Sequence, residues 1–394
     1  MKKWIAVIIE LLLVGVLLLT FKLLGSSFFK GESTEEVSTA TVVETTESVV
    51  LATTTTEEIT TTEEEKPVTV TISACGDCTM GIDKQFAYEG SFNDTFDKKG
   101  ADYFLEKVKP IFDADDLTIA NLECILTDKG ERRNKNWAFR GKPEYVDVLS
   151  HGGVDAVAFA NNHCMDFGDI SYTDTMNILE EKNMPYASYE RVTTYDANGI
   201  KVGMIAINCL GVTEESETTG SIGQAEKYLT QDMEKLKGMN CDMIVVSFHW
   251  GVQSDPKLSE NQKVLGHKAV DMGADLVLGH HPHIIQGIEK YNGAYIVYSL
   301  ANFCFGGHKN PKDKDTFIYQ QTFTFLGGEK TDKTTARVYP CRVTSVKDYN
   351  NYQPVVVEGE DADKVIKKIL DRSDGFDIKI DAEGYLEKAD DQVE

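Results

Sequence analysis

Six side chains with oxygen or imidazole-nitrogen donors are spaced along the sequence in a pattern that could hold a metal ion. Carboxylate, amide and imidazole groups together suit a divalent cation such as Mn, Fe, Zn or Ca, and the pattern does not choose among them. Each residue alone has a simpler interpretation as a turn residue, a solvated strand end or a hydrogen-bonded histidine. The candidate ligands are Asp77, Glu123, Asn162, His249, His281 and His283.

The His-Pro-His segment at residues 281–283 is the strongest single signal. Alternate residues of an extended chain point the same way, and proline stiffens the link between them. His163 directly follows the candidate ligand Asn162, so it is placed to protonate a leaving group. Asp166 could hold His163 in one tautomer. The catalytic candidates are His163, Asp166 and Asp77.

The candidate ligands follow apolar runs with the length and composition of buried strands. Helical patterns lie between several of these runs, and strands alternating with helices predict an α/β domain. Sites in open α/β sheets lie at the carboxyl ends of strands, so we expect the ligands to meet there. The expected strands are Val68–Ser73, Leu117–Leu122, Ala156–Ala160, Met243–Phe248 and Ala274–Leu278, and the expected helices are Tyr103–Phe112, Glu144–His151, Ser171–Lys182, Gly223–Lys237 and Glu260–Met272.

Two hairpin signals interrupt the alternation of strands and helices. Asn-Gly pairs at residues 198–199 and 292–293 lie between apolar runs, and Asn-Gly is a preferred two-residue hairpin turn. Residues 316–357 are rich in β-branched and aromatic side chains, which predicts a second, more antiparallel sheet. A short helix over Asp361–Asp371 and an acidic tail are expected at the end of the chain.

The chain is strongly acidic, with 40 Lys and Arg against 64 Asp and Glu and a formal net charge of −24. A nucleic-acid-binding protein needs a basic face, so we expect no nucleic-acid partner. An anionic substrate would need a local basic site, and residues 131–142 hold five basic residues against one acidic residue. A solvated loop is an equally good interpretation of this run. Its candidate substrate-binding residues are Arg132, Arg133 and Arg140, and a smaller second candidate comprises His308, Lys309 and Lys312.

The first 66 residues predict the location of the protein. A basic start followed by a long apolar run predicts a transmembrane signal anchor over residues 1–25, with the N-terminus in the cytoplasm. A cleaved signal peptide is the alternative, but its apolar region is normally shorter. Residues 26–66 are rich in Thr and Glu and predict a disordered stalk. The domain of residues 67–394 would then lie outside the cell membrane.

The eight cysteines do not form the dense framework of a small secreted domain. Cys75 and Cys78 form a C-x-x-C pair, but no second pair completes a zinc site. We expect most cysteines to be small buried apolar residues, with a soft-metal or redox-sensitive site as the alternative. The sequence does not decide whether Cys209 and Cys241 form a disulfide.

The motifs around the candidate ligands carry a family resemblance. The sequence resembles the capsule-synthesis protein (CapA) family, which is associated with making or exporting poly-γ-glutamate. That family in turn looks like a distant branch of the calcineurin-like metallophosphoesterases. The resemblance runs from about residue 68 to about residue 305. It rests on Gly76-Asp77, Asn121-Leu122-Glu123, Ala160-Asn161-Asn162-His163, His249-Trp250-Gly251, Gly279-His280-His281-Pro282-His283 and Tyr298-Ser299-Leu300-Ala301-Asn302-Phe303.

The resemblance implies a metallophosphoesterase-like α/β/β/α sandwich with two metal positions. The histidine that accompanies the first aspartate would fall at Thr79, which cannot replace it as a ligand. We therefore expect one firm metal position and one weak or empty position. The first would be bound by Glu123, Asn162, His249 and His281, and the second by Asp77, Glu123 and His283.

The resemblance also implies a surface-anchored protein of capsule synthesis or export, with a metal-dependent, hydrolase-like domain. Its expected partners are an anionic polymer such as poly-γ-glutamate and membrane-bound capsule synthase subunits. A non-catalytic assembly or export factor is one alternative, and Thr79 favours it. An ordinary secreted phosphoesterase is another. The Asn162-His163 pair and the two late histidines favour some chemistry over none.

Overall fold

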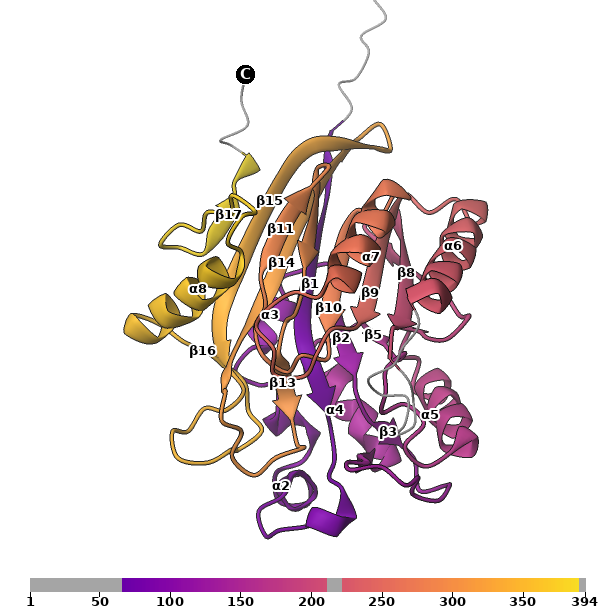
Figure 1. Ribbon diagram of the computed structural model, residues 1–394, viewed down its shortest axis with the longest axis vertical. Coiled ribbons are helices and arrows are strands. Elements are labelled where there is room, and N and C mark those ends of the chain that lie inside the picture. The colour runs from indigo at the N-terminus through magenta and orange to yellow at the C-terminus, as the bar shows by residue number, and fades with distance from the viewer. Residues whose placement is uncertain (1–65, 211–221, 390–394) are drawn as a thin grey trace, which may run out of the picture. The chain divides into compact units, whose positions relative to one another are not determined.

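The strands that carry the candidate ligands belong to two sheets in the computed structural model, which describes residues 66–210 and 222–389 (Figure 1). In the first sheet, four adjacent strands run parallel to one another. Antiparallel strands extend the sheet on the other side of β1. The parallel strands are β1 (Val68–Thr79), β2 (Leu117–Leu122), β5 (Ala156–Ala158) and β6 (Tyr186–Ala187). The others are β14 (Asp315–Leu326), β15 (Glu329–Arg342), β16 (Val355–Val356) and β17 (Tyr385–Glu387), with β13 (Asn302–Phe305) parallel to the end of β1.

The second sheet has four parallel strands and an antiparallel strand at each edge. The parallel strands are β8 (Ile200–Asn208), β9 (Met243–His249), β10 (Leu276–His280) and β12 (Ala294–Val297). The edge strands β7 (Thr193–Ala197) and β11 (Ile288–Tyr291) are joined to β8 and β12 by the two Asn-Gly turns, which confirms both hairpin predictions. The asparagine and glycine of each turn have positive φ, as this turn type requires.

Helices cover the outer faces of the two sheets, and apolar side chains fill the three interfaces. One cluster joins the sheets, with Val70 and Ile119 packed among residues such as Leu278. The first sheet is covered by α2 (Phe92–Lys99), α3 (Lys109–Phe112), α4 (Val146–His151) and α5 (Asp169–Glu181), and the second by α6 (Ile222–Gly238) and α7 (Glu260–Asp271). The prediction of a mixed α/β fold is confirmed. The helix α8 (Glu360–Arg372) packs Val365 and Ile369 into the cluster between the sheets. The shorter elements are β3 (Ile125–Leu126), β4 (Arg140–Gly141), η1 (Lys84–Phe86), η2 (Ala101–Tyr103) and η3 (Pro143–Tyr145).

Two local predictions were wrong. The antiparallel segment after residue 315 does not form a separate sheet, because β14 pairs along β1 from Val68 opposite Phe325 to Ala74 opposite Tyr319. β1 is a long buried strand whose free edge needs a hydrogen-bonding partner, and β14 supplies it. The helix expected over Tyr103–Phe112 is only a short helix, α3, preceded by turns. Pro110 lacks the N–H that a continuous helix would need there.

The predicted membrane anchor over residues 1–25 lies outside the described residues, as does the predicted stalk up to residue 65. Within residues 66–210 and 222–389, no helix is both long enough and apolar enough to cross a membrane. The anchor, the stalk and the extracellular location therefore stay predictions.

All eight cysteines are free thiols. Cys209 and Cys241 are not joined, so the disulfide that the sequence left open does not form. Cys75 and Cys78 are completely buried in the core between the first sheet and its helices. Burial raises the pKa of Cys75 well above its usual value, as expected for an apolar thiol.

Candidate metal centre

Glu123 lies between two groups of potential metal ligands. It follows β2 directly, and its side chain is completely buried. Its Oε1 accepts no hydrogen bond in the described part of the chain, although Nε2 of His249 and Nε2 of His283 lie 3.3 Å and 3.6 Å away. Burial raises the pKa of Glu123 well above its usual value; His283 opposes this effect and Asp77 adds to it. A buried carboxylate in this position is costly without a cation.

The first group comprises Glu123, His249 and His281, whose ligand atoms all lie within 4.8 Å of one another. Asn162 extends it, since its Oδ1 lies 2.8 Å from His249 Nε2. Burial, together with the charge of neighbouring histidines, lowers the pKa of His249 well below its usual value and that of His281 to about 3. Nδ1 of His281 is buried without a hydrogen-bond partner among the described residues. Neutral imidazoles with free nitrogens are the form that binds metal.

The second group comprises Asp77, Glu123 and His283, again with ligand atoms within 4.8 Å. His283 Nδ1 lies 3.0 Å from Asn302 Oδ1 and 3.1 Å from Asp77 Oδ2. Burial alone would lower the pKa of His283, but Glu123 and Asp77 raise it to about 9. Thr79 Oγ1 donates to Glu123 Oε2 over 3.4 Å. The position where the resemblance implies a histidine therefore holds a hydroxyl that bonds to the shared carboxylate.

The donors of the two groups fit a divalent cation. They are carboxylates, imidazoles and an amide oxygen, and two of the buried atoms lack hydrogen bonds among the described residues. The six predicted ligands are thus brought together as the two expected sets.

The two imidazoles of the His-Pro-His segment reach the candidate metal centre for a different reason from the one predicted. His281 and His283 have φ of 95° and 57°, so the segment is a left-handed turn rather than an extended chain. Such backbone is strained for residues other than glycine and persists where surrounding contacts hold it. Asp77 provides one contact, since its Oδ2 accepts from the His281 N–H over 3.4 Å. The turn sends the two imidazoles to different ligand groups, with ring centroids 5.6 Å apart.

Three polar residues that we did not single out from the sequence hold the ligands in place. Asn121 Nδ2 donates to Asp77 Oδ1 over 2.8 Å. His280 Nδ1 lies 3.2 Å from the same oxygen. Asn302, opposite Asp77 in the β1–β13 pairing, accepts from His283 and so leaves Nε2 of that imidazole for a ligand. Their signal was present, since each lies inside a motif of the family resemblance.

His163 and Asp166 form the pair that the sequence predicted. His163 Nδ1 donates to Asp166 Oδ2 over 2.8 Å, and the Phe139 N–H donates to the same oxygen over 2.7 Å. Asp166 Oδ1 accepts from Lys135 Nζ over 2.7 Å, and both of these side chains are completely buried. Lys135 also donates to the Asn162 carbonyl over 2.7 Å. The buried lysine thus ties the His163–Asp166 pair to the candidate ligand Asn162.

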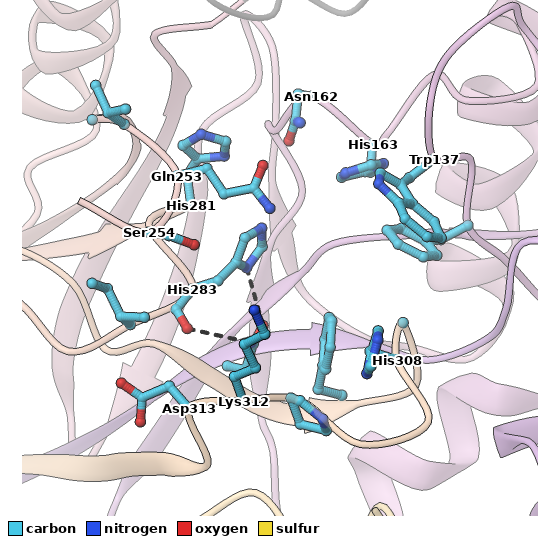
Figure 2. A pocket seen from close by; sticks show the side chains of 18 of the residues that line it. Trp137, Asn162, His163, Gln253, Ser254, His281, His283, His308, Lys312 and Asp313 are labelled. Atoms are coloured by element: carbon cyan, nitrogen blue, oxygen red, sulfur yellow. Dashed lines mark hydrogen bonds between the residues drawn. The ribbon is translucent and has the colours of Figure 1, made fainter. Parts of the chain in front are cut away.

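A pocket of about 790 Å³ opens beside these residues (Figure 2). In Figure 2, His163 and Trp137 lie on one side, and Gln253, Ser254 and His281 lie on another. Aromatic side chains and a lysine also belong to the lining. These are Trp137, Phe139, Phe305 and Lys312.

The predicted substrate-binding arginines do not line this pocket. Arg132 pairs with the buried Asp83 over 2.6 Å, and Arg133 pairs with Asp169 over 2.7 Å. Arg140 donates to backbone carbonyls of residues 128–130 and lies over the Phe167 ring. Their contacts organise the loop of residues 131–142, and their role in binding substrate stays a prediction. Of the smaller candidate, His308 and Lys312 do line the pocket.

The fold and the site define a mixed α/β protein with a cluster of potential metal ligands where its two sheets meet. A family model described as "Bacterial capsule synthesis protein PGA_cap" matches residues 71–307, which is more than half of the chain. The chain belongs to this family.

Two relatives agree with the family assignment. The capsule biosynthesis protein CapA of Bacillus anthracis is 26% identical over 339 residues, covering 81% of this chain and 80% of that protein. The PGA biosynthesis protein CapA of Bacillus subtilis is 31% identical over 223 residues, covering 53% of this chain and 58% of that protein. A hypothetical protein from Thermus thermophilus has a solved structure that is 14% identical and covers 69% of this chain and 99% of its own, with a TM-score of 0.41. The family match thus agrees with the resemblance inferred from the motifs.

Proposed function

We propose that this chain is a metal-dependent hydrolase of poly-γ-glutamate capsule synthesis, acting on a phosphoester or γ-glutamyl bond. The observation that carries the proposal is the shared carboxylate of Glu123. Two groups of buried ligands meet at this carboxylate, whose Oε1 accepts no hydrogen bond in the described part of the chain. The names of the relatives supply the pathway, since they refer to capsule and PGA biosynthesis.

The residues around the ligands have distinct roles in this proposal. A divalent ion held by Glu123, Asn162, His249 and His281 would lower the pKa of water and polarise the bond under attack. In its doubly protonated form, His163 would donate a proton to the leaving group from Nε2, while Asp166 accepts from Nδ1–H over 2.8 Å, which orients the ring and stabilises the imidazolium.

We further propose that residues 1–25 anchor the protein in the cell membrane with its main domain outside, beside membrane-bound synthase subunits and the anionic polymer. Thr79 favours a second candidate, a non-catalytic assembly or export factor. Its hydroxyl contacts Glu123 but cannot supply the imidazole of a complete second position. A secreted phosphoesterase differs from both candidates, since it would require no partner in the membrane.

The test compares full-length wild-type protein with His163→Ala. Metal content is measured by mass spectrometry, and turnover is measured on a phosphomonoester and on a γ-linked glutamate oligomer. We expect equal metal content and a loss of turnover of about 100-fold or more in the variant, which is the usual contribution of a general acid. Metal-loaded wild-type protein that turns over neither substrate would favour the assembly factor. Unchanged turnover in the variant would remove His163 from the mechanism.

A further inference from the structure

We propose that residues 306–314, the loop between β13 and β14, form a subsite for a carboxylate or phosphate group of the substrate. The ammonium group of Lys312 would supply its positive charge. The inference deepens the proposed function, on which it rests, because it names the group that the substrate presents to the wall of the same pocket. Lys312 lines this pocket together with His163, His281 and His283 (Figure 2).

The charge of Lys312 is not neutralised within the described part of the chain, where its ammonium has neither a hydrogen bond nor an ion pair. The adjacent carboxylate of Asp313 is instead bound by Lys368 Nζ, at 2.9 Å and 3.1 Å. Lys314 donates to the backbone carbonyl of Lys347 over 2.8 Å. Lys312 is therefore the pocket-lining lysine with a charge left for a ligand.

His308 adds a hydrogen-bond donor to the same loop. Its Nδ1 accepts from the Asn310 N–H over 2.9 Å, which places the proton of the neutral imidazole on Nε2. His308 is exposed and lines the pocket. An ammonium and an N–H donor on a single loop are the kinds of group that bind the oxygens of a carboxylate or a phosphate.

Hydrogen bonds to the rest of the fold hold the loop in place. The Gly306 N–H donates to the Thr79 carbonyl over 2.7 Å. The Asn350 side chain donates to the carbonyls of Phe305 and His308 over 2.7 Å and 3.2 Å, and its N–H donates to the Lys309 carbonyl over 3.1 Å. A loop that is ordered before binding loses less conformational entropy when an anion arrives.

The charge of the whole chain favours a local cationic subsite for an anionic substrate. The net charge of −24 repels an anion, and the arginines of the basic loop already have partners: Asp83 for Arg132, Asp169 for Arg133 and backbone carbonyls for Arg140. A cation in the pocket reverses the sign of the potential where the substrate must dock. An anionic group bound by Lys312 would lie in the same pocket as the candidate ligands His281 and His283.

The test measures binding by titration calorimetry with the full-length protein, with and without added Mn²⁺. The probes are a γ-linked glutamate trimer, its neutral amide analogue and inorganic phosphate. We expect Lys312→Ala to weaken binding of the trimer or of phosphate by about tenfold or more, which is typical for loss of a charge-assisted contact. Lys333→Ala, which changes an exposed lysine on β15 away from the pocket lining, is the matched control and should bind as wild type does.

The pattern of affinities identifies the source of the anion. A Lys312-dependent affinity for the trimer and not for phosphate assigns the subsite to a carboxylate, and the reverse assigns it to a phosphate. Equal affinities of wild type and Lys312→Ala, or no binding of either anion to wild type, would overturn the subsite. Lys312-dependent binding without any turnover would instead reject the hydrolase and keep the subsite, so the two failures are distinguishable.

Discussion

The two ligand groups around Glu123 share a carboxylate but differ in the state of their histidines. Burial holds the pKa of His281 at about 3 and that of His249 well below its usual value, so both imidazoles are neutral. In the other group, Glu123 and Asp77 overcome the effect of burial and raise the pKa of His283 to about 9. The histidines of the first group can accept a cation directly, whereas His283 in the second group must first release a proton.

The difference arises from the immediate neighbours of each imidazole. His249 and His281 lie edge-on with ring centroids 5.0 Å apart. After burial, the charge of a neighbouring histidine lowers each pKa, that of His281 for His249 and that of His283 for His281. His283 instead lies 3.1 Å from an oxygen of Asp77. The same fold thus builds a neutral and a charged half of one site, and Thr79 leaves the charged half a ligand short. We therefore expect the first group to bind metal more tightly.

The largest expected effect follows replacement of the shared carboxylate. Glu123→Ala removes a ligand from both groups, so bound metal should fall from about one equivalent or more to none, as measured by mass spectrometry. Glu123→Gln is the matched control for shape. It removes the cost of the buried charge, so the metal-free variant should melt at or above the temperature of the metal-free wild type. Metal retained by both variants would place the ion elsewhere.

Separate replacement of His281 and His283 should affect different metal positions. His281→Ala removes a ligand of the neutral half, and we expect loss of the tightest equivalent of metal. His283→Ala should keep that equivalent and lose only weaker binding. Equilibrium titration with Mn²⁺ measures both outcomes. A tight equivalent that survives in His281→Ala and disappears in His283→Ala would reverse our assignment of the two halves.

A smaller effect is expected when the missing ligand is restored. Thr79→His places an imidazole beside Glu123 and Asp77, and should raise the number of bound metal ions toward two. Thr79→Val is the matched control, because it keeps the shape and removes the hydroxyl bond to Glu123 without adding a donor. If both variants bind as wild type does, the threonine is not what limits the second position.

The pH dependence of metal binding should also differ between the halves. The pKa of His283 is about 9, so at lower pH a proton on His283 competes with metal. Affinity at the second position should therefore fall as pH falls, by up to tenfold per pH unit. At the first position, proton competition at the histidines should change little between pH 6 and 9, since the pKa of His281 is about 3. Any pH dependence that comes from Glu123 is common to both positions, so affinity should fall less at the first position than at the second. Manganese titrations across this range in wild type and His283→Ala test both statements. A weak position with the same affinity at pH 6 and 9 would contradict the assignment.

The sequence carried more information about the ligands than about their surroundings. Polar residues after apolar runs predicted which side chains would meet, because carboxyl ends of parallel strands lie at the same end of a sheet. The convergence of His281 and His283 was predicted for the wrong reason, since left-handed backbone depends on contacts made by the distant Asp77. The pairing of β14 with β1 likewise joins segments that lie far apart in the chain.

The basic loop shows that a charge pattern alone does not identify the contacts of its side chains. The composition of residues 131–142 suggests a patch for an anion, but the structure places Arg132 against Asp83 and buries Lys135 against Asp166. The partners of these cations are separated from them in the sequence and cannot be inferred from local composition. Lys312 belongs to a shorter basic run, yet it lines the pocket.

The central claim is that a divalent cation binds between Glu123, His249 and His281 more tightly than between Asp77, Glu123 and His283. Anomalous diffraction at the manganese edge, from crystals soaked at a series of Mn²⁺ concentrations, tests it most directly. We expect a peak among Glu123, His249 and His281 at the lowest concentration, with a peak beside Asp77 and His283 only at higher concentration or not at all. No peak at Glu123 at any concentration, or a first peak beside His283, would contradict the account.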